Sequence, residues 1–126
     1  MRRGLTVLLM LATATAAAAG LSYDGAKAKA DADEASLACS LHQALLESQG
    51  RALEAAFSKC LPSIPQPPDK SPFTVVMELD ATGKVVATWR HGETPLAGCV
   101  HRVLATQTLF APPRAPFYTS IEMSFD

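Results

Sequence analysis

The residues best suited by type to ligating a metal or acting as a nucleophile or base are Cys39, Cys60, Cys99, His42, His91 and His101. The pairs Cys39-x-x-His42 and Cys99-x-His101 would together supply two thiolates and two imidazoles, a ligand set that zinc accepts. However, residues two positions apart on a helix point about 200° away from each other. Cys99 and His101 are therefore poorly placed to bind one ion, and we predict no metal site and no cofactor.

The sequence also disfavours an enzyme. Cys99 falls on the apolar stripe of a predicted helix, whereas a reactive thiolate needs an accessible, electropositive position. The carboxylate pairs Asp31/Asp33 and Glu78/Asp80 are typical of solvated surfaces and turns. The chain contains no glycine-rich phosphate loop and no recognisable serine–histidine–aspartate motif. We therefore nominate no catalytic residue and predict that the protein is not an enzyme.

The first nineteen residues have the composition of a secretory signal sequence. Arg2 and Arg3 are followed by a short apolar run and by alanines at positions 16–19, the pattern that signal peptidase cleaves. We predict a signal peptide at 1–19 and a periplasmic or secreted protein with no membrane insertion after cleavage. The alternative is that the segment is kept as an uncleaved membrane anchor. In both cases the remaining chain enters a compartment where disulfides form.

The remaining chain is short and weakly acidic. Without Arg2 and Arg3, nine lysines and arginines stand against twelve aspartates and glutamates. About 105 residues form one small domain. This charge balance also predicts a protein without the cationic surface that binds nucleic acid or anionic membranes.

An odd number of cysteines in an exported chain predicts one disulfide and one free thiol. Cys60 ends the first helical pattern, and Cys99 lies in the first turns of a later helix. The chain between them returns to the same end of the domain, so we expect a Cys60–Cys99 bridge. If the first helix instead reverses at Gly50, Cys39 would meet Cys60, and Cys39–Cys99 is a further alternative. The role of Cys39 stays open.

The domain is expected at 34–126. Residues 20–33 alternate alanine with charge, which predicts a flexible lead-in or a frayed helical turn, without which the domain should still fold. From Ala35 onward, apolar residues recur every three or four positions. This favours one long helix weakened at Gly50 over a helical hairpin. Residues 61–72 form a proline-rich connector.

The second half predicts a hairpin, a helix and a final strand. Residues 73–79 and 85–89 alternate apolar and polar side chains around a turn at 80–83. Keeping the apolar side chains on one face gives the pairs Leu79–Val85, Met77–Ala87 and Val75–Trp89. Trp89 would then lie beneath the helices. Thr94 and Pro95 are typical of a helix start, and the final strand follows the prolines that end this helix.

These elements predict an α+β fold, with an N-terminal helix, a β-hairpin, a helix and a strand. The chain path gives a three-stranded antiparallel sheet in the order second, first, last strand, covered on one face by two helices. The second and last strands are then the two edges of the sheet.

This layout resembles the C-terminal domain of TonB-family proteins and the similar small fold of the TolA C-terminal domain. The resemblance covers residues 73–125, with an apolar strand, a turn containing Gly-Lys-Val, a helix that begins near a proline, Phe-x-Pro-Pro and a closing strand. A bridge between a cysteine before the first strand and one in the second helix also looks like cysteine-containing, TonB-like periplasmic proteins. The chain lacks the long Pro-Lys/Pro-Glu spacer and a tyrosine-proline motif before the first strand. The resemblance implies a fold and partner binding by strand addition, but not energy transduction, and we transfer no functional residue.

We therefore expect an exported, non-catalytic binding module that engages a protein partner of the cell envelope at a sheet edge. The alternatives are an immunity or inhibitor protein of an exported enzyme, or a small periplasmic enzyme. A pocket with converging polar groups would favour these alternatives, and the sequence does not indicate one.

Overall fold

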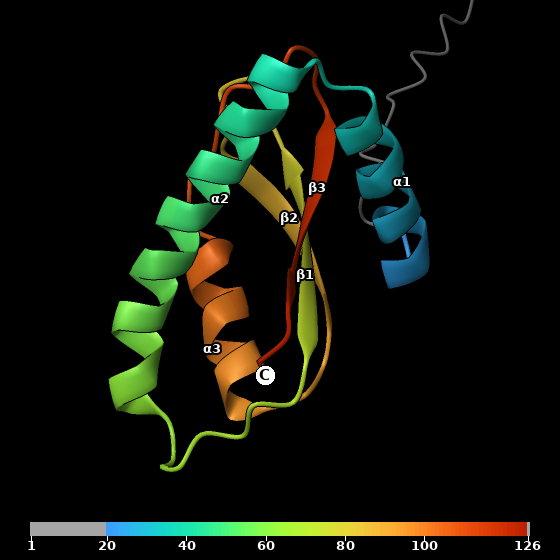
Figure 1. Cartoon of the computed structure of the whole chain (residues 1–126). Coiled ribbons are helices and arrows are strands. Elements are labelled where there is room, and N and C mark those ends of the chain that lie inside the picture. Colours follow the sequence, from blue (N-terminus) through green and yellow to red (C-terminus); the bar gives the residue numbers. More distant parts are fainter. Residues whose placement is uncertain (1–19, 126) are drawn as a thin grey trace, which may run out of the picture.

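Three helices and a three-stranded sheet make up the computed structural model, which describes residues 20–125 (Figure 1). In chain order the elements are α1 (Tyr23–Ala35), α2 (Cys39–Cys60), the 3-10 turn η2 (Leu61–Ser63), β1 (Phe73–Leu79), β2 (Val85–His91), α3 (Pro95–Leu104) and β3 (Phe117–Met123). The signal peptide predicted for residues 1–19 lies outside the described residues. None of the described helices is long and apolar enough to cross a membrane.

The sheet is antiparallel and has the predicted strand order, β2-β1-β3. β1 occupies the centre and pairs with β3 along its whole length. The outer two strands, β2 and β3, are therefore the sheet edges. The α+β class and the strand order are as predicted from the sequence.

The hairpin register differs from the prediction beyond its first pair. Leu79 lies opposite Val85 as expected, but one extra residue in β2 then forms a bulge, and every later partner moves by one position. Trp89 consequently lies opposite Val76 rather than Val75. Because neighbouring residues of a strand face opposite sides of a sheet, this single step moves Trp89 to the other face. The other two predicted pairs are therefore wrong by one residue.

Helices α2 and α3 cover one face of the sheet (Figure 1). α2 is one continuous helix that passes through Gly50, so the helical hairpin alternative is wrong. The Thr94 side chain accepts a hydrogen bond from the Ala97 amide at 3.1 Å and caps α3, whose first residue is Pro95, as predicted. The core between these helices and the sheet consists mainly of Leu45, Ala52, Ala56, Val75, Met77, Leu79, Leu96, Val100, Leu104, Phe117 and Ile121.

The segment 20–33, predicted to be a flexible lead-in, instead forms most of α1 and covers the second face of the sheet (Figure 1). Ala26 and Ala30, one turn apart, are fully buried in a cluster with Val76 and Tyr118. Small side chains let a helix approach a sheet closely. An alanine stripe carries little apolar periodicity, which is why the pattern did not predict a packed helix.

The boundary between α1 and α2 also differs from the prediction. Ser36 ends α1, and the helix expected from Ala35 begins at Cys39. The domain boundary predicted at residue 34 therefore falls inside α1.

Trp89 packs on the α1 side, so its predicted place beneath α2 and α3 is wrong. Its indole Nε1 donates a hydrogen bond to the Leu21 carbonyl oxygen at 2.9 Å, and its ring centroid lies 5.9 Å from that of Tyr118. The residue ties the start of the described chain to the sheet. The bulge in β2 is the physical cause, since it reverses the face on which Trp89 emerges.

Candidate functional site

The two edge strands present different sets of outward backbone groups. Backbone groups along a strand point alternately toward and away from the neighbouring strand. In β3 the amides of Tyr118 and Ser120 point away from β1, because they donate to side chains outside the sheet. The registers of β1 with its two neighbours carry this alternation over to β2. There the backbone N–H and C=O groups that point away from β1 are those of Thr88 and Arg90.

Side chains from α1 and α2 occupy the β3 edge. The Tyr118 amide donates to Asp33 Oδ2 at 2.9 Å, and the Ser120 amide donates to Glu34 Oε1 at 3.1 Å. The Ser120 carbonyl oxygen accepts a hydrogen bond from Gln49 Nε2 at 3.2 Å. The middle of this edge is thus closed to a further strand.

A loop segment closes the beginning of β2. The Val85 amide donates to the Gln107 carbonyl oxygen at 3.1 Å, and the Leu109 amide donates to the Gly83 carbonyl oxygen at 2.8 Å. Gly83 has a φ of 89°, and a Cβ at this position would lie 2.3 Å from the Phe110 carbonyl oxygen. Only glycine accepts both conditions, so Gly83 is what allows the loop to lie against the strand.

The rest of β2 is open. None of the residues from Val86 to His91 is buried, and Val86 is 51% exposed. Within residues 20–125, the outward backbone N–H and C=O groups of Thr88 and Arg90 have no protein hydrogen-bond partner. Two donors and two acceptors are therefore free along this edge.

His101 of α3 fixes the side chains above the open edge. Its Nδ1 lies 3.1 Å from Arg90 Nη1, and its Nε2 lies 2.7 Å from Thr88 Oγ1. Because arginine only donates hydrogen bonds, Nδ1 must accept, and Nε2–H donates to the threonine hydroxyl. Burial lowers the pKa of His101, and the charges of Arg90 and Arg102 lower it further. The ring is therefore neutral and holds Thr88 and Arg90 in place.

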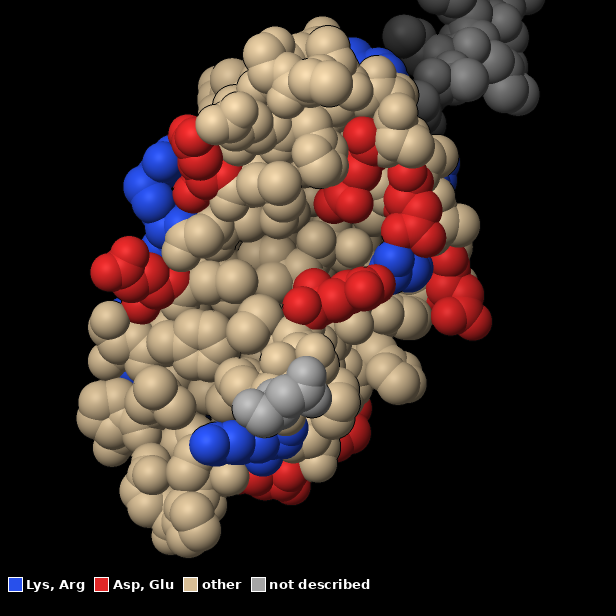
Figure 2. Space-filling model, in the orientation of Figure 1, with Lys and Arg blue, Asp and Glu red and all other residues tan. Residues whose placement is uncertain are grey.

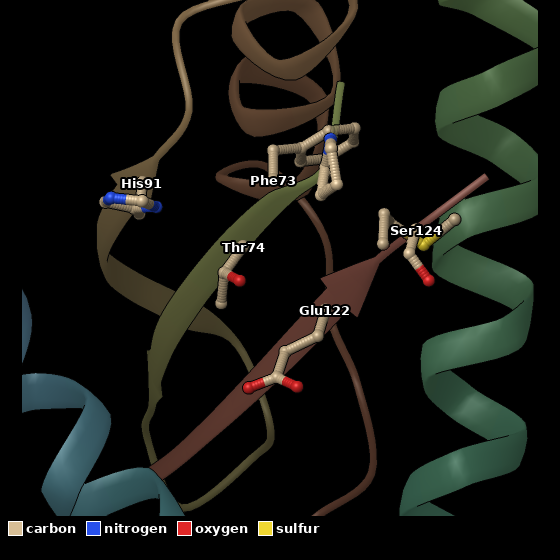
Figure 3. A pocket seen from close by; sticks show the side chains of 7 residues that line it. Phe73, Thr74, His91, Glu122 and Ser124 are labelled. Carbon is tan, nitrogen blue, oxygen red and sulfur yellow. The ribbon is translucent and has the colours of Figure 1, made fainter. Parts of the chain in front are cut away.

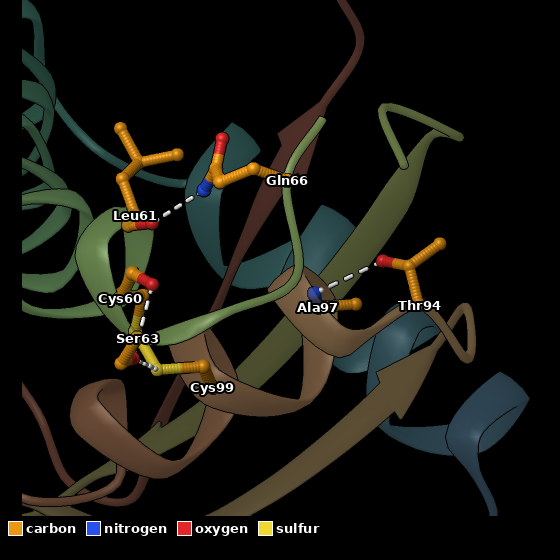
Figure 4. The surroundings of a disulfide bond; sticks show 7 residues. All are labelled: Cys60, Leu61, Ser63, Gln66, Thr94, Ala97 and Cys99. Carbon is orange, nitrogen blue, oxygen red and sulfur yellow. Dashed lines mark hydrogen bonds between the residues drawn. A yellow bond between two sulfur atoms is a disulfide. The ribbon is translucent and has the colours of Figure 1, made fainter. Parts of the chain in front are cut away.

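The predicted cysteine pair is bonded. Cys60 and Cys99 form a disulfide with a Cα–Cα distance of 5.7 Å, which joins the end of α2 to α3 (Figure 4). Cys39 is free and exposed. The Cys99 sulfur is thus not available as a metal ligand, and within residues 20–125 no group of three His, Cys, Asp or Glu side chains is placed to hold a metal ion.

The surface also has two hollows. One, of about 390 Å³, lies where the ends of β2 and β3 meet the start of β1, and Figure 3 shows Thr74, His91 and Glu122 around it. The other, of about 410 Å³, lies beside the disulfide and is lined by Lys59 and Arg102 among others. Among the residues that line each hollow, no acidic and basic side chains are hydrogen-bonded to each other; Glu122 of the first hollow is paired with Lys27, which is not one of its lining residues.

No family model, no curated protein and no solved structure matches the chain.

The sequence pattern did not predict the side chains that cover the β3 edge. Asp33, Glu34 and Gln49 contact β3 residues that are 70 to 86 positions away in the chain. One signal was available: Asp33 and Glu34 lie in the last turn of α1, which has no basic residue there. Carboxylates at a helix C-terminus oppose the helix dipole, so their presence indicates a role outside the helix.

Proposed function

We propose that this protein is an exported, non-catalytic binding module, periplasmic or secreted, that takes up an extended segment of a protein partner at the β2 edge. One observation carries the proposal: Thr88 and Arg90 present free backbone groups on β2, whereas in the middle of β3 the amides of Tyr118 and Ser120 are bound by carboxylates of α1. The resemblance of residues 73–125 to TonB-family C-terminal domains supports the same mode of binding.

One sheet edge is covered by side chains and the other is partly open, and this difference supports a role for the open edge. Proteins generally cover sheet edges, since free backbone groups pair with other chains. Here β3 is covered by three side chains and the start of β2 by residues 107–109, but the row at Thr88 and Arg90 is left accessible. A strand added there would gain up to four backbone hydrogen bonds, each contributing about 0.5–1.5 kcal/mol.

Export is supported by the disulfide. Cys60–Cys99 links two helices of the domain, and such structural bridges persist in oxidising compartments. The signal-like composition of residues 1–19 points to the same compartment.

A peptide-display selection tests the proposed edge. Unconstrained random peptides are selected on the wild-type protein, and each enriched peptide is then measured against Thr88→Pro and Thr88→Val. Proline removes the outward N–H, which has no partner within the described domain, so the variant is expected to fold. We expect Thr88→Pro to weaken binding at least about tenfold and Thr88→Val to bind like wild type.

The valine variant is the matched control, because it keeps the amide and removes only the hydroxyl that contacts His101. Ser120→Pro serves as the comparison on β3. Its amide donates to Glu34, so this substitution should lower stability without acting on the β2 peptides. Peptides that bind Thr88→Pro as tightly as wild type would show that the β2 edge is not the binding site.

A further inference from the structure

A pair of arginines lies beside the open edge of β2. A Cβ placed on Gly98 of α3 would be 3.5 Å from Arg102 Nη1 and 3.6 Å from Arg90 Nη1. The Nη1 atoms of the two arginines are therefore at most about 7 Å apart, on either side of Gly98. The neutral ring of His101 lies against Arg90 in the same cluster.

This cluster has little negative charge to balance it. Arg90 forms a long ion pair with Glu93 at 3.4 Å, and the Glu93 side chain is 88% exposed, so water screens most of the interaction. Within residues 20–125 Arg102 forms no ion pair. Lys59, which also has none, lines the hollow beside the disulfide together with Arg102 and extends the cationic surface.

Several acidic side chains lie near the closed edge. Figure 2 shows a group of them on the α1 side of that view, and others over α2 and at the lower end of the molecule. At the closed edge Asp33 and Glu34 are engaged with β3, and Glu122 is paired with Lys27 at 3.0 Å. The charge distribution thus distinguishes the two edges, because the closed edge is lined with carboxylates and the open edge with arginines.

The register of β2 places the arginines on a definite side of an added strand. Thr88 and Arg90 lie opposite Met77 and Val75, whose side chains belong to the core on the α3 side of the sheet. An added strand continues the same pleat, so every second side chain of that strand would project toward the Arg90–Arg102 pair.

We propose that the β2 edge binds an extended acidic segment, one that carries carboxylate side chains at alternate positions facing Arg90 and Arg102. This inference rests on the proposed function, since it assumes that the edge accepts a strand. Guanidinium groups bind carboxylates through charge-assisted, often bidentate hydrogen bonds. The free backbone groups supply affinity for any extended chain, and the arginine pair supplies the preference for acidic side chains.

A set of matched peptides tests the preference. The probe is a short peptide in which threonine alternates with glutamate, compared with peptides carrying glutamine or lysine in place of glutamate. Binding is followed through the amide signals of Thr88 and Arg90 in an NMR titration. We expect the glutamate peptide to bind about tenfold more tightly than the glutamine peptide at low salt, and this advantage to shrink as salt is added.

Single substitutions assign the preference to the arginine pair. Arg102→Gln removes an exposed side chain without a described ion pair, and should bring the glutamate and glutamine peptides to equal affinity. Arg51→Gln on the surface of α2 is the matched control, with the same loss of charge at an exposed site, and should keep the full preference. Glu93→Gln removes a competing carboxylate and should strengthen binding of the glutamate peptide.

Four outcomes would overturn the proposal. Equal affinity of all three peptides, with loss of binding in Thr88→Pro, would keep the edge and reject the acidic preference. Tighter binding of the lysine peptide would reject the preference outright. No shift of either amide with any peptide at millimolar concentration would also reject it, while the display selection separately decides on the edge. Concentration-dependent dimerisation that Thr88→Pro abolishes would assign the edge to a second copy of the chain.

Discussion

Replacing Glu34 with alanine removes one of the carboxylates that hold α1 against β3. Glu34 Oε1 accepts hydrogen bonds from the Ser120 amide and from the hydroxyl of Thr119, which is fully buried. After the substitution, water can reach the half-buried Ser120 amide, and Thr119 keeps only its contact with Gln49. The buried Thr119 hydroxyl then has no acceptor among the groups that now surround it.

The expected cost follows from these two donors. A hydrogen bond to a charged group contributes about 1.5–3 kcal/mol, and an unsatisfied buried donor costs about 1–3 kcal/mol. Allowing for hydration of Ser120, we expect the Glu34→Ala variant to lose about 2 kcal/mol of unfolding free energy. For a domain of about 100 residues this lowers Tm by about 10 °C.

Thermal and urea unfolding, followed by circular dichroism, measure this loss, and Glu54→Ala is the matched control. Glu54 is an exposed glutamate of α2 with no ion pair among residues 20–125, so its replacement should change stability by less than about 0.5 kcal/mol. Amide hydrogen exchange at Ser120 should become faster only in the Glu34 variant. Equal Tm values for the two variants would refute the argument that Glu34 fastens α1 to the sheet edge.

Three further expectations concern the covalent link, the glycines and pH. Reducing the Cys60–Cys99 bridge, which spans 39 positions, should lower the unfolding free energy by about 4 kcal/mol in the chain-entropy model, measured by urea unfolding with and without reductant; an unchanged midpoint would contradict this. Gly83→Ala should destabilise by at least about 1 kcal/mol, because φ is 89° and a backbone oxygen lies 2.3 Å from the new Cβ. Gly50→Ala, with no atom within 4 Å of its Cβ in mid-helix, should stabilise by about 0.5–1 kcal/mol in the same assay. Folding lowers the pKa of His101, so the neutral ring contributes its full stability above the unfolded pKa of about 6.5. This contribution is lost as the pH falls from there through the folded pKa. Tm measured across this range should therefore fall less in His101→Gln than in wild type.

Chain connectivity was sufficient to predict the sheet order, and it favoured the Cys60–Cys99 pair over the two alternatives that involve Cys39. A hairpin followed by a helix and a strand leaves few arrangements, and a continuous first helix brings Cys60 to the same end of the domain as Cys99. The register was not accessible in the same way. Val85 and Val86 are both apolar, so alternation alone cannot decide which of them faces the core, and the bulge is decided by packing.

The site was predictable only in part. The strand order identified β2 and β3 as edges, but which edge is open depends on contacts between distant parts of the chain. Asp33 was predicted to be a solvated carboxylate of a flexible lead-in, and Glu34 stood at the start of the predicted domain with no role assigned. Only the three-dimensional structure brings them to the amides of Tyr118 and Ser120. Polar contacts of this kind leave no periodic pattern in a sequence.

The two faces of the sheet are held by different forces, and this bears on how the protein aggregates when heated. α2 and α3 share a large apolar core and a covalent bond, whereas α1 is held mainly by two buried alanines and a few carboxylate contacts. α1 is therefore the element expected to detach first. Its detachment frees the amides of Tyr118 and Ser120, so partly heated molecules should associate through β3, the edge that is protected in the native state.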